Sequence, residues 1–270
     1  MSFESIYPLF ADISACETVM EKKKQISFSE QLSVERNLIE GIESKSSLEF
    51  IEEGIIRQFS PFISLRLLCL YSITQSGIAS KDYKNLLKLF LQSYGHKYMK
   101  TFFTLKKLGI IVESSATTLS VTNNPLSGTN MISFLRSTES IRKYRQTIKK
   151  LNLIPTISSE YDIRNPKECS YVFGGAYTPL ISRVIELVCD SKNSNQEISK
   201  LLNGKFVSLN QRLKPQNYTK IVPKAVLIFM IGGITYAEVS ALRFLAKQMD
   251  VQIIIATTSV INGSDFLKYL

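Results

Sequence analysis

The sequence predicts an α/β protein that is mostly helical. Apolar residues recur at helical spacing through most of the first 110 residues and again over residues 179–190. Near the carboxyl end, two almost continuous apolar runs, residues 226–231 and 251–257, flank a further helical segment. Such an arrangement is typical of a parallel βαβ unit. With 270 residues, 44% of them apolar, the chain can form one large domain or two modest ones.

The first predicted helices lie within residues 16–59. One stretch, FSEQLSVERNLIEGI, places Phe28, Leu32, Glu35, Leu38 and Ile39 along a single stripe. A second stretch, SSLEFIEEGIIRQ, repeats the pattern. This part of the chain is therefore expected to be a set of amphipathic helices.

A block of three helices is predicted after Pro61. The segments 61–77, 80–95 and 96–109 each end at a glycine, as the carboxyl ends of helices commonly do. Residues 110–122 are rich in β-branched side chains and predict a short hairpin. Together these segments predict a module that is similar to a winged helix.

The carboxyl-terminal βαβ unit is expected to lack neighbours. Its strands are apolar on both sides and need cover on both faces, and a parallel sheet of two strands is not stable alone. One more candidate strand, SYVFGG, begins at Ser170, and a helix over residues 179–190 begins at Pro179 with Thr178 as its cap. The sheet that this sequence encodes is therefore incomplete.

The glycine pair after the first of these strands raises the question of a phosphate site. Gly232 and Gly233 match neither the GxGxxG fingerprint nor the GK[ST] ending of a P-loop. Thr235 and Glu238 instead have the spacing of a capping box, which occupies the free amides at the start of a helix with its own carboxylate. The glycines are therefore predicted to permit a tight turn rather than to bind phosphate.

Charge and hydropathy restrict the class of protein. The net charge of +10 favours acidic partners, whether nucleic acid, anionic membrane or acidic helices of another protein, and the densest basic cluster, residues 136–150, is typical of a solvated helix face. The longest apolar run, residues 225–231, is far shorter than the roughly 20 residues that cross a bilayer. The first fifteen residues do not resemble a secretory signal, so the expected location is cytoplasmic.

No catalytic, metal or cofactor chemistry is predicted. The chain has one histidine and four widely spaced cysteines, which provide no zinc-ligand set. No GxSxG or HExxH motif is present, and Cys69 and Cys189 lie among apolar residues as small buried thiols do. The sequence therefore predicts a protein that is not an enzyme.

Several separated segments together resemble one family. In order, LRLLCLYSITQSGI, LQSYGHKYMKTFFTLKKLGII, KKLNLIP, YVFGGAYTPLISRVIE, GGITYAEVSALRFLAK and IATTSVINGS are similar to the carboxyl-terminal half of vacuolar-sorting SM proteins. These Sec/Munc-type proteins regulate SNARE-driven membrane fusion. The combination of KKLNLIP with YVFGGAYTPL resembles the B-type member more than the A-type member.

The resemblance implies a division of the chain. Residues 1–60 would form the end of a helical, SNARE-contacting lobe, residues 61–150 a helical, winged-helix-like lobe, and residues 151–270 the carboxyl-terminal part of a central α/β domain. It also implies a non-enzymatic subunit in vesicle-mediated transport and membrane fusion, in endosome-to-lysosome or recycling traffic. Such a subunit would be cytoplasmic and held through its partners at late endosome, recycling endosome or lysosome membranes.

The partners implied are SNARE helices and a vacuolar-sorting subunit with a helical carboxyl-terminal region. The resemblance implies that this subunit binds through the helix pair around LQSYG, with Lys88, Tyr94, His96 and Met99 as the candidate contacts. Aromatic and methionine side chains near a turn can anchor such an interface. Equally open is a structural role, with Tyr94 and Met99 in the core and His96 as an ordinary surface residue.

The alternative function is that of a winged-helix protein that binds nucleic acid. The charge and the three-helix block support it, but a recognition helix needs exposed polar side chains that face a groove. In the third helix, the aromatic and apolar residues indicate packing instead; they are Tyr98, Phe102, Phe103 and Leu105. The sequence therefore favours the SM-type function without nucleic acid.

Overall fold

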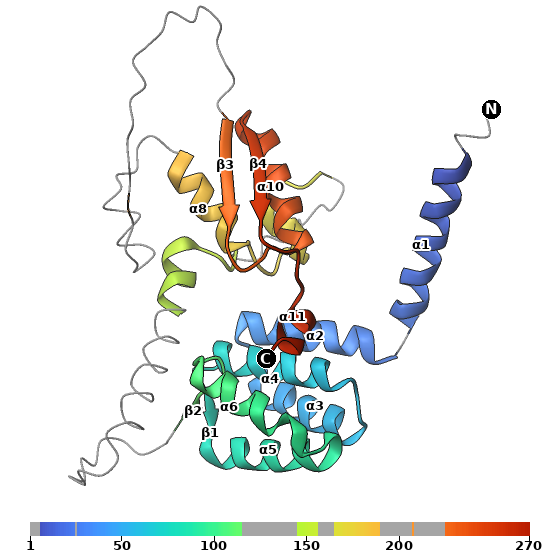
Figure 1. Ribbon diagram of the computed structural model, residues 1–270, viewed down its shortest axis with the longest axis vertical. Coiled ribbons are helices and arrows are strands. Elements are labelled where there is room, and N and C mark those ends of the chain that lie inside the picture. Colours follow the sequence, from blue (N-terminus) through green and yellow to red (C-terminus); the bar gives the residue numbers. More distant parts are fainter. Residues whose placement is uncertain (1–5, 25, 115–144, 156–164, 190–206, 208–224) are drawn as a thin grey trace, which may run out of the picture.

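The structure is a computed structural model that describes residues 6–24, 26–114, 145–155, 165–189, 207 and 225–270. It confirms a mostly helical α/β architecture, in which a helical part and a smaller α/β part are joined near the carboxyl end (Figure 1). Each of the two sheets described has two strands.

The helical part contains α1 (Ile6–Lys24), α2 (Ile26–Glu40), α3 (Ser44–Ile56), α4 (Pro61–Thr74), β1 (Ile78–Ala79), α5 (Ser80–Tyr94), the 3-10 helix η2 (His96–Tyr98), α6 (Met99–Lys107) and β2 (Glu113–Ser114). The α/β part contains the 3-10 helix η3 (Cys169–Phe173), α8 (Leu180–Cys189), β3 (Ala225–Met230), α10 (Tyr236–Met249), β4 (Gln252–Thr257) and α11 (Gly263–Lys268). Residues 145–151 are also helical, whereas the rest of the basic cluster, residues 136–144, lies outside the described residues.

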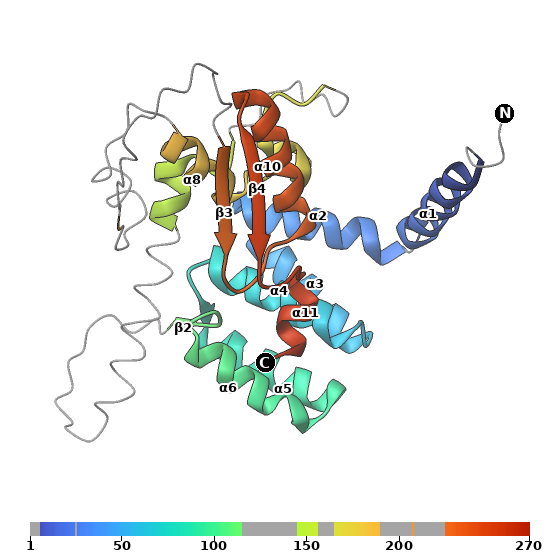
Figure 2. The same ribbon diagram turned by 45° about the horizontal axis from the view of Figure 1, so that its top comes forward.

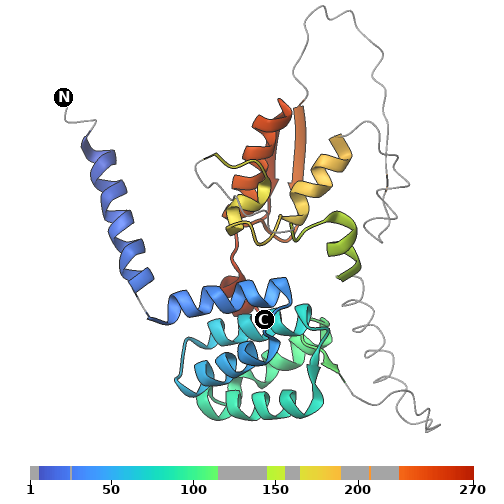
Figure 3. The ribbon, with the colours of Figure 1, turned by 180° about the vertical axis from the view of Figure 1, so that it is seen from behind.

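The core of the helical part is shared by helices on both sides of residue 60. Ile51 and Ile55 of α3 pack with Leu65 and Leu68 of α4 and with Phe90 of α5. The predicted stripe on α2 is divided: its Leu38 is buried, whereas Phe28 and Leu32 are exposed. Helix α1 has its main contact with α2 and extends away from the rest of the chain (Figures 1 and 3).

The predicted hairpin over residues 110–122 differs from the observed pairing. Glu113–Ser114 forms strand β2, which pairs in parallel with Ile78–Ala79, far away in the sequence. Residues 115–122 lie outside the described residues. Strand β2 therefore connects the end of the three-helix block to the start of α5.

The βαβ unit predicted near the carboxyl end is confirmed. Strands β3 and β4 are parallel, in a register that runs from the pair Ala225–Gln252 to the pair Met230–Thr257, and α10 connects them. Ile228 of β3 and Leu242 and Leu245 of α10 form the core of this part. Helix α8 begins at Leu180, one residue later than predicted, and its Ile185 joins the same core. The predicted cap is wrong, because the buried hydroxyl of Thr178 has no hydrogen-bond partner and the first turn bonds to the Pro179 carbonyl oxygen.

The strand predicted from Ser170 is wrong, because these residues form the 3-10 helix η3. The ring of Tyr171 packs on Phe244 of α10 with a centroid distance of 5.2 Å, and the thiol of Cys169 lies 3.8 Å from the carbonyl oxygen of Ala241. Gly174 then ends η3 with a φ of +61°. These contacts hold the segment against α10.

The turn after β3 has the capping box that the sequence predicts. The amide of Thr235 donates to Glu238 Oε2 (2.8 Å), and the amide of Glu238 donates to Thr235 Oγ1 (3.2 Å). Gly232 and Gly233 have φ of +105° and +126°, and a Cβ on Gly233 would lie 2.9 Å from Ile261 Cδ1. The glycines thus allow a turn that other residues would strain.

The last helix ties the α/β part to the helical part. Helix α11 packs against α4, and its Leu267, only 4% exposed, joins the core of the helical part (Figures 1 and 2). Among the described residues, no helix has both the length and the apolar character that a membrane span requires.

Candidate partner-binding surface

The four predicted contact residues lie on the corner formed by α5, η2 and α6. Lys88 is on α5, Tyr94 ends α5, His96 begins η2 and Met99 begins α6. Lys88, His96 and Met99 are exposed, whereas Tyr94 is half-buried. The structure therefore places three of the four on the surface and assigns the fourth to packing.

Tyr94 connects α5 to the start of α4. Its hydroxyl donates to the carbonyl oxygen of Phe59 (2.7 Å) and lies 3.3 Å from Ser64 Oγ. Burial raises the pKa of Tyr94 above its ordinary value, although the hydrogen bond with Ser64 opposes this change. The phenol therefore stays neutral and acts as a structural donor.

An aromatic cluster packs at the corner formed by α5, η2 and α6. Phe90 contacts Tyr94, Tyr98 and Phe102, with ring-centroid distances of 4.5, 5.5 and 5.1 Å. Gly95 connects α5 to η2 with a φ of +94°, a conformation that side chains disfavour. The aromatic cluster and the backbone conformation of Gly95 together set the orientation of η2 and of the start of α6, which carry the exposed residues His96 and Met99.

Helix α6 presents an exposed apolar pair, Met99 and Phe103, four residues apart on one face. Their exposed fractions are 48% and 68%. The sequence-based interpretation assigned Phe103 to packing, and this is wrong for Phe103, whereas Phe102 and Leu105 are indeed buried. The spacing of four shows that Phe103 shares a face with Met99, but it does not show whether that face is exposed.

Lysines surround the Met99–Phe103 pair. Lys97, Lys100 and Lys107 are exposed on η2 and α6. Lys97 Nζ lies 5.2 Å from the centroid of the Tyr98 ring. The surface is therefore apolar at its centre and positive at its rim, which suits a helix with apolar and acidic side chains.

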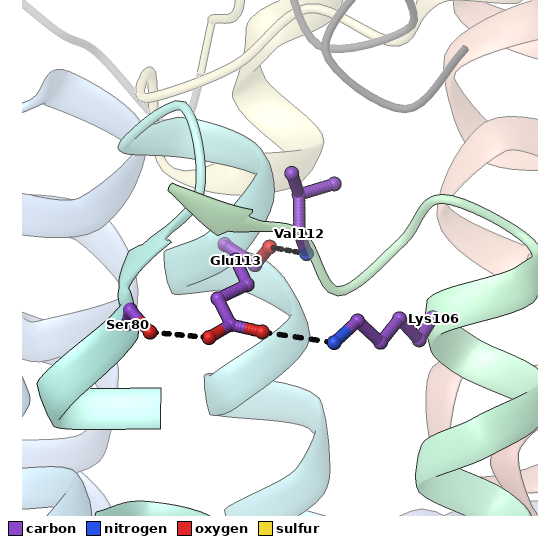
Figure 4. A network of polar contacts seen from close by, with 5 residues as sticks. Ser80, Lys106, Val112 and Glu113 are labelled. Atoms are coloured by element: carbon purple, nitrogen blue, oxygen red, sulfur yellow. Dashed lines mark hydrogen bonds and ion pairs between the residues drawn. The ribbon is translucent and has the colours of Figure 1, made fainter. Parts of the chain in front are cut away.

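Glu113 connects α6 to the start of α5. One of its carboxylate oxygens accepts from the Ser80 hydroxyl and the other accepts from Lys106 Nζ at 2.9 Å (Figure 4). Burial opposes ionisation of Glu113, but the Ser80 hydroxyl and the Lys106 ammonium outweigh it and lower its pKa. Lys106 is thereby paired with Glu113, although its side chain remains 49% exposed.

Cys69 of α4 lies buried in the core of the helical part rather than at this surface. Burial raises the pKa of Cys69 to about 12, so its thiol is not a nucleophile at neutral pH. Across the described ranges, no group of three or more potential ligands could hold a metal ion.

Comparison with known proteins identifies the family. A sequence model of the Sec1 family matches residues 12–269. The chain belongs to the Sec1 family. Sec1-family proteins are not enzymes, in agreement with the prediction from the sequence.

The relatives of this Sec1-family chain are vacuolar-sorting proteins. It is 37% identical to the rat vacuolar protein sorting-associated protein 33B over 266 residues. The matched region covers 95% of this chain and 43% of the rat protein. The human 33B protein is 36% identical over 266 residues, which again cover 95% of this chain and 43% of the relative. The rat 33A protein is 28% identical over 263 residues, or 95% of the chain and 40% of the relative. The predicted resemblance is thus confirmed, and the chain spans less than half the length of these relatives.

Proposed function

We propose that the chain is a non-enzymatic SM-type subunit that docks a vacuolar-sorting partner subunit and SNARE helices in endosome-to-lysosome or recycling traffic. Membership of the Sec1 family and 37% identity to a vacuolar sorting-associated protein support this proposal. The subunit would be peripheral to late endosome, recycling endosome or lysosome membranes and held there by its partners. The same family membership favours this function over nucleic-acid binding.

The partner subunit would bind at the corner of α5, η2 and α6. The observation that carries this proposal is the exposed apolar pair Met99–Phe103 on a rigid aromatic base. An exposed methionine and phenylalanine are typical anchors of a protein interface. Lys88 and His96 would contribute polar contacts at the rim, and Tyr94 would hold the surface in place.

SNARE helices would bind along α1 and α2. Phe28 and Leu32, four residues apart on α2, are 42% and 57% exposed. Ile13 and Met20 on α1 are 47% and 52% exposed. Such faces match the apolar stripes by which amphipathic helices associate.

A capture experiment tests partner docking. The probe is the helical carboxyl-terminal region of the vacuolar-sorting subunit that binds B-type SM proteins. Met99→Asp should abolish capture because it places a charge at the centre of the apolar surface. Ile42→Asp is the matched control, since Ile42 has a nearly equal exposed fraction of 49% on the loop after α2.

The two variants should keep the circular dichroism spectrum and melting temperature of the unchanged chain. Equal capture by Met99→Asp and by the unchanged chain would exclude this surface. Capture of duplex DNA with a steep salt dependence, and no capture of the subunit, would favour the nucleic-acid function instead.

A further inference from the structure

The helical part is basic on one side and acidic on the other. Residues 80–108, which form α5, η2 and α6, include seven lysines and one acidic residue, a net charge of +6. Residues 26–56, which form α2 and α3, include seven glutamates and two basic residues, a net charge of −5. Helix α5 lies on the side of the helical part away from α2 and from the β3–β4 sheet (Figures 1 and 3). The outer surface of α5 is therefore at the positive end of the helical part.

Helix α5 has a polar stripe along its outer side. Its exposed residues fall three or four positions apart, as residues on one helix face do. The opposite face is buried in the core through Leu86 and Phe90. The stripe extends roughly 16 Å along the helix axis and contains no apolar and no acidic residue. Its members, called here the lysine stripe, are Lys81, Lys84, Asn85, Lys88 and Gln92.

The lysines of the stripe form no ion pairs among the described residues, whereas several other exposed cations do. Arg36 lies 2.8 Å from a carboxylate oxygen of Glu40, and Arg57 lies 2.6 Å from one of Glu53. No such pair includes Lys81, Lys84 or Lys88. Their positive charge is therefore available to an anionic partner.

Two carboxylates near α5 leave this charge in place. Asp82, the one acidic residue of α5, is half-buried and lies off the lysine stripe. Burial of Glu113 opposes its ionisation, whereas Ser80, Lys106 and then Lys84 lower its pKa. The two oxygens of Glu113 already accept from Ser80 and Lys106, so Lys84 stays without an ion pair (Figure 4).

This chemistry fits the surface of an anionic membrane. Protein interfaces are anchored by apolar or aromatic side chains, and nucleic-acid sites favour arginine, but the stripe has no apolar residue and residues 80–108 have no arginine. Lipid headgroups need neither, because each lysine near an anionic leaflet raises the affinity about fivefold through its charge. We propose that the lysine stripe binds the headgroups of an anionic membrane directly. In this contact α5 faces the bilayer, and the negative α2 and α3 face away from it.

Vesicle sedimentation of the whole chain tests this contact. The probes are phosphatidylcholine vesicles with and without phosphatidylserine. The unchanged chain should bind only the vesicles with phosphatidylserine, and Lys81→Gln with Lys84→Gln should weaken this binding about 30-fold, or fivefold for each lysine. Lys81→Arg with Lys84→Arg should preserve it. Lys45→Gln with Lys247→Gln is the matched control, because it removes two exposed lysines of α3 and α10 and should leave binding nearly unchanged.

Fluorescence quenching measures the orientation on the membrane. In a background with Cys16→Ser and Cys189→Ser, a fluorophore is attached either to Asn85→Cys on the lysine stripe or to Ile42→Cys on the loop before α3. Lipids with a nitroxide on the headgroup should quench the fluorophore on the stripe strongly and the fluorophore on the loop weakly.

The proposal fails if the stripe variant and the control variant bind vesicles equally, if phosphatidylserine makes no difference, or if both fluorophores are quenched equally. It also fails if the chain binds duplex DNA more tightly than vesicles and Lys81→Gln with Lys84→Gln loses that binding, since a nucleic acid would then be the ligand. These outcomes are independent of subunit capture, because Lys81 and Lys84 lie at the start of α5 and Met99 lies beyond its end.

Discussion

Tyr94 was expected either to contact a partner or to pack in the core, and its hydroxyl decides between these roles. Tyr94→Phe keeps the ring against Phe90 and removes the hydrogen bond to the Phe59 carbonyl. The free energy of unfolding should fall by about 1 kcal/mol, a usual value for one hydrogen bond. Urea denaturation measures this loss, and subunit capture should stay unchanged. If Tyr94→Phe lost subunit capture without losing stability, Tyr94 would be a partner contact rather than a structural residue.

Glu113 should make stability depend on pH in the acid range. Its pKa is lowered in the folded chain, so its stabilising effect is present above the unfolded-state pKa and is lost as the pH falls through the folded-state pKa. Glu113→Gln should therefore lower the free energy of unfolding by about 1–2 kcal/mol at neutral pH. The difference from the unchanged chain should shrink steadily below about pH 4.5.

Denaturation of both proteins at several pH values tests this dependence. Glu53→Gln is the control, because its ion pair with Arg57 is more exposed, with 52% and 63% of the side chains accessible. That exposed pair should contribute well under about 1 kcal/mol at any pH. A Glu113→Gln effect that is constant with pH would rule out the ionic role.

At the scale of single residues, the sequence predicted contact residues that are mostly exposed, but it did not predict every exposed side chain near them. Met99 and His96 were predicted as contacts and are exposed. Phe103 was assigned to packing because three of its neighbours on the helix are also apolar or aromatic. Which side of α6 faces the core depends on α4 and α5, and spacing within α6 alone does not specify it.

At the scale of elements, the capping box of α10 should stabilise the βαβ unit. Thr235→Ala removes the acceptor of the Glu238 amide and should cost about 1 kcal/mol. Thr235→Ser keeps the hydroxyl and should be nearly neutral. Thermal denaturation measures both variants.

Inorganic phosphate tests the other interpretation of this turn. Adding it should not raise the melting temperature of the unchanged chain, because the capping box already occupies the free amides. A clear rise would show that phosphate binds.

Local elements follow from the sequence more readily than non-local ones. The capping box involves residues three positions apart, and it was predicted correctly. Strand β2 pairs with β1, which is separated from it by α5, η2 and α6, so no local pattern encodes their parallel register. Likewise, η3 is set by contacts with Ala241 and Phe244 of α10, and β-branched and aromatic residues alone predicted a strand there.

At the scale of the whole molecule, α11 should control the stability of the helical part. Leu267→Ala removes a side chain that is 4% exposed and should lower the free energy of unfolding by about 2–4 kcal/mol. Tyr269→Ala is the matched control two residues away, since Tyr269 is 85% exposed. Urea denaturation should separate the two variants clearly. Equal stability would mean that α11 does not contribute to that core.

The predicted division of the chain at residues 60 and 150 stays a prediction. Residues 1–60 and 61–150 were expected to form different lobes, and the core of Ile51, Ile55 and Leu65 crosses that boundary. The docking of α11 on α4 was not expected, because the two helices are separated by nearly 190 residues and no local pattern links them.

The position of Leu267 also matters while the chain is being made. The helical part is synthesised before α11, yet its core includes Leu267 of α11. At roughly 5–20 residues per second, ribosomes need on the order of 10–30 s to travel from the end of α6 to α11. During that interval the core position that Leu267 later fills is exposed to water. Exposed apolar surface of this kind is what makes partly folded chains prone to aggregation and dependent on chaperones.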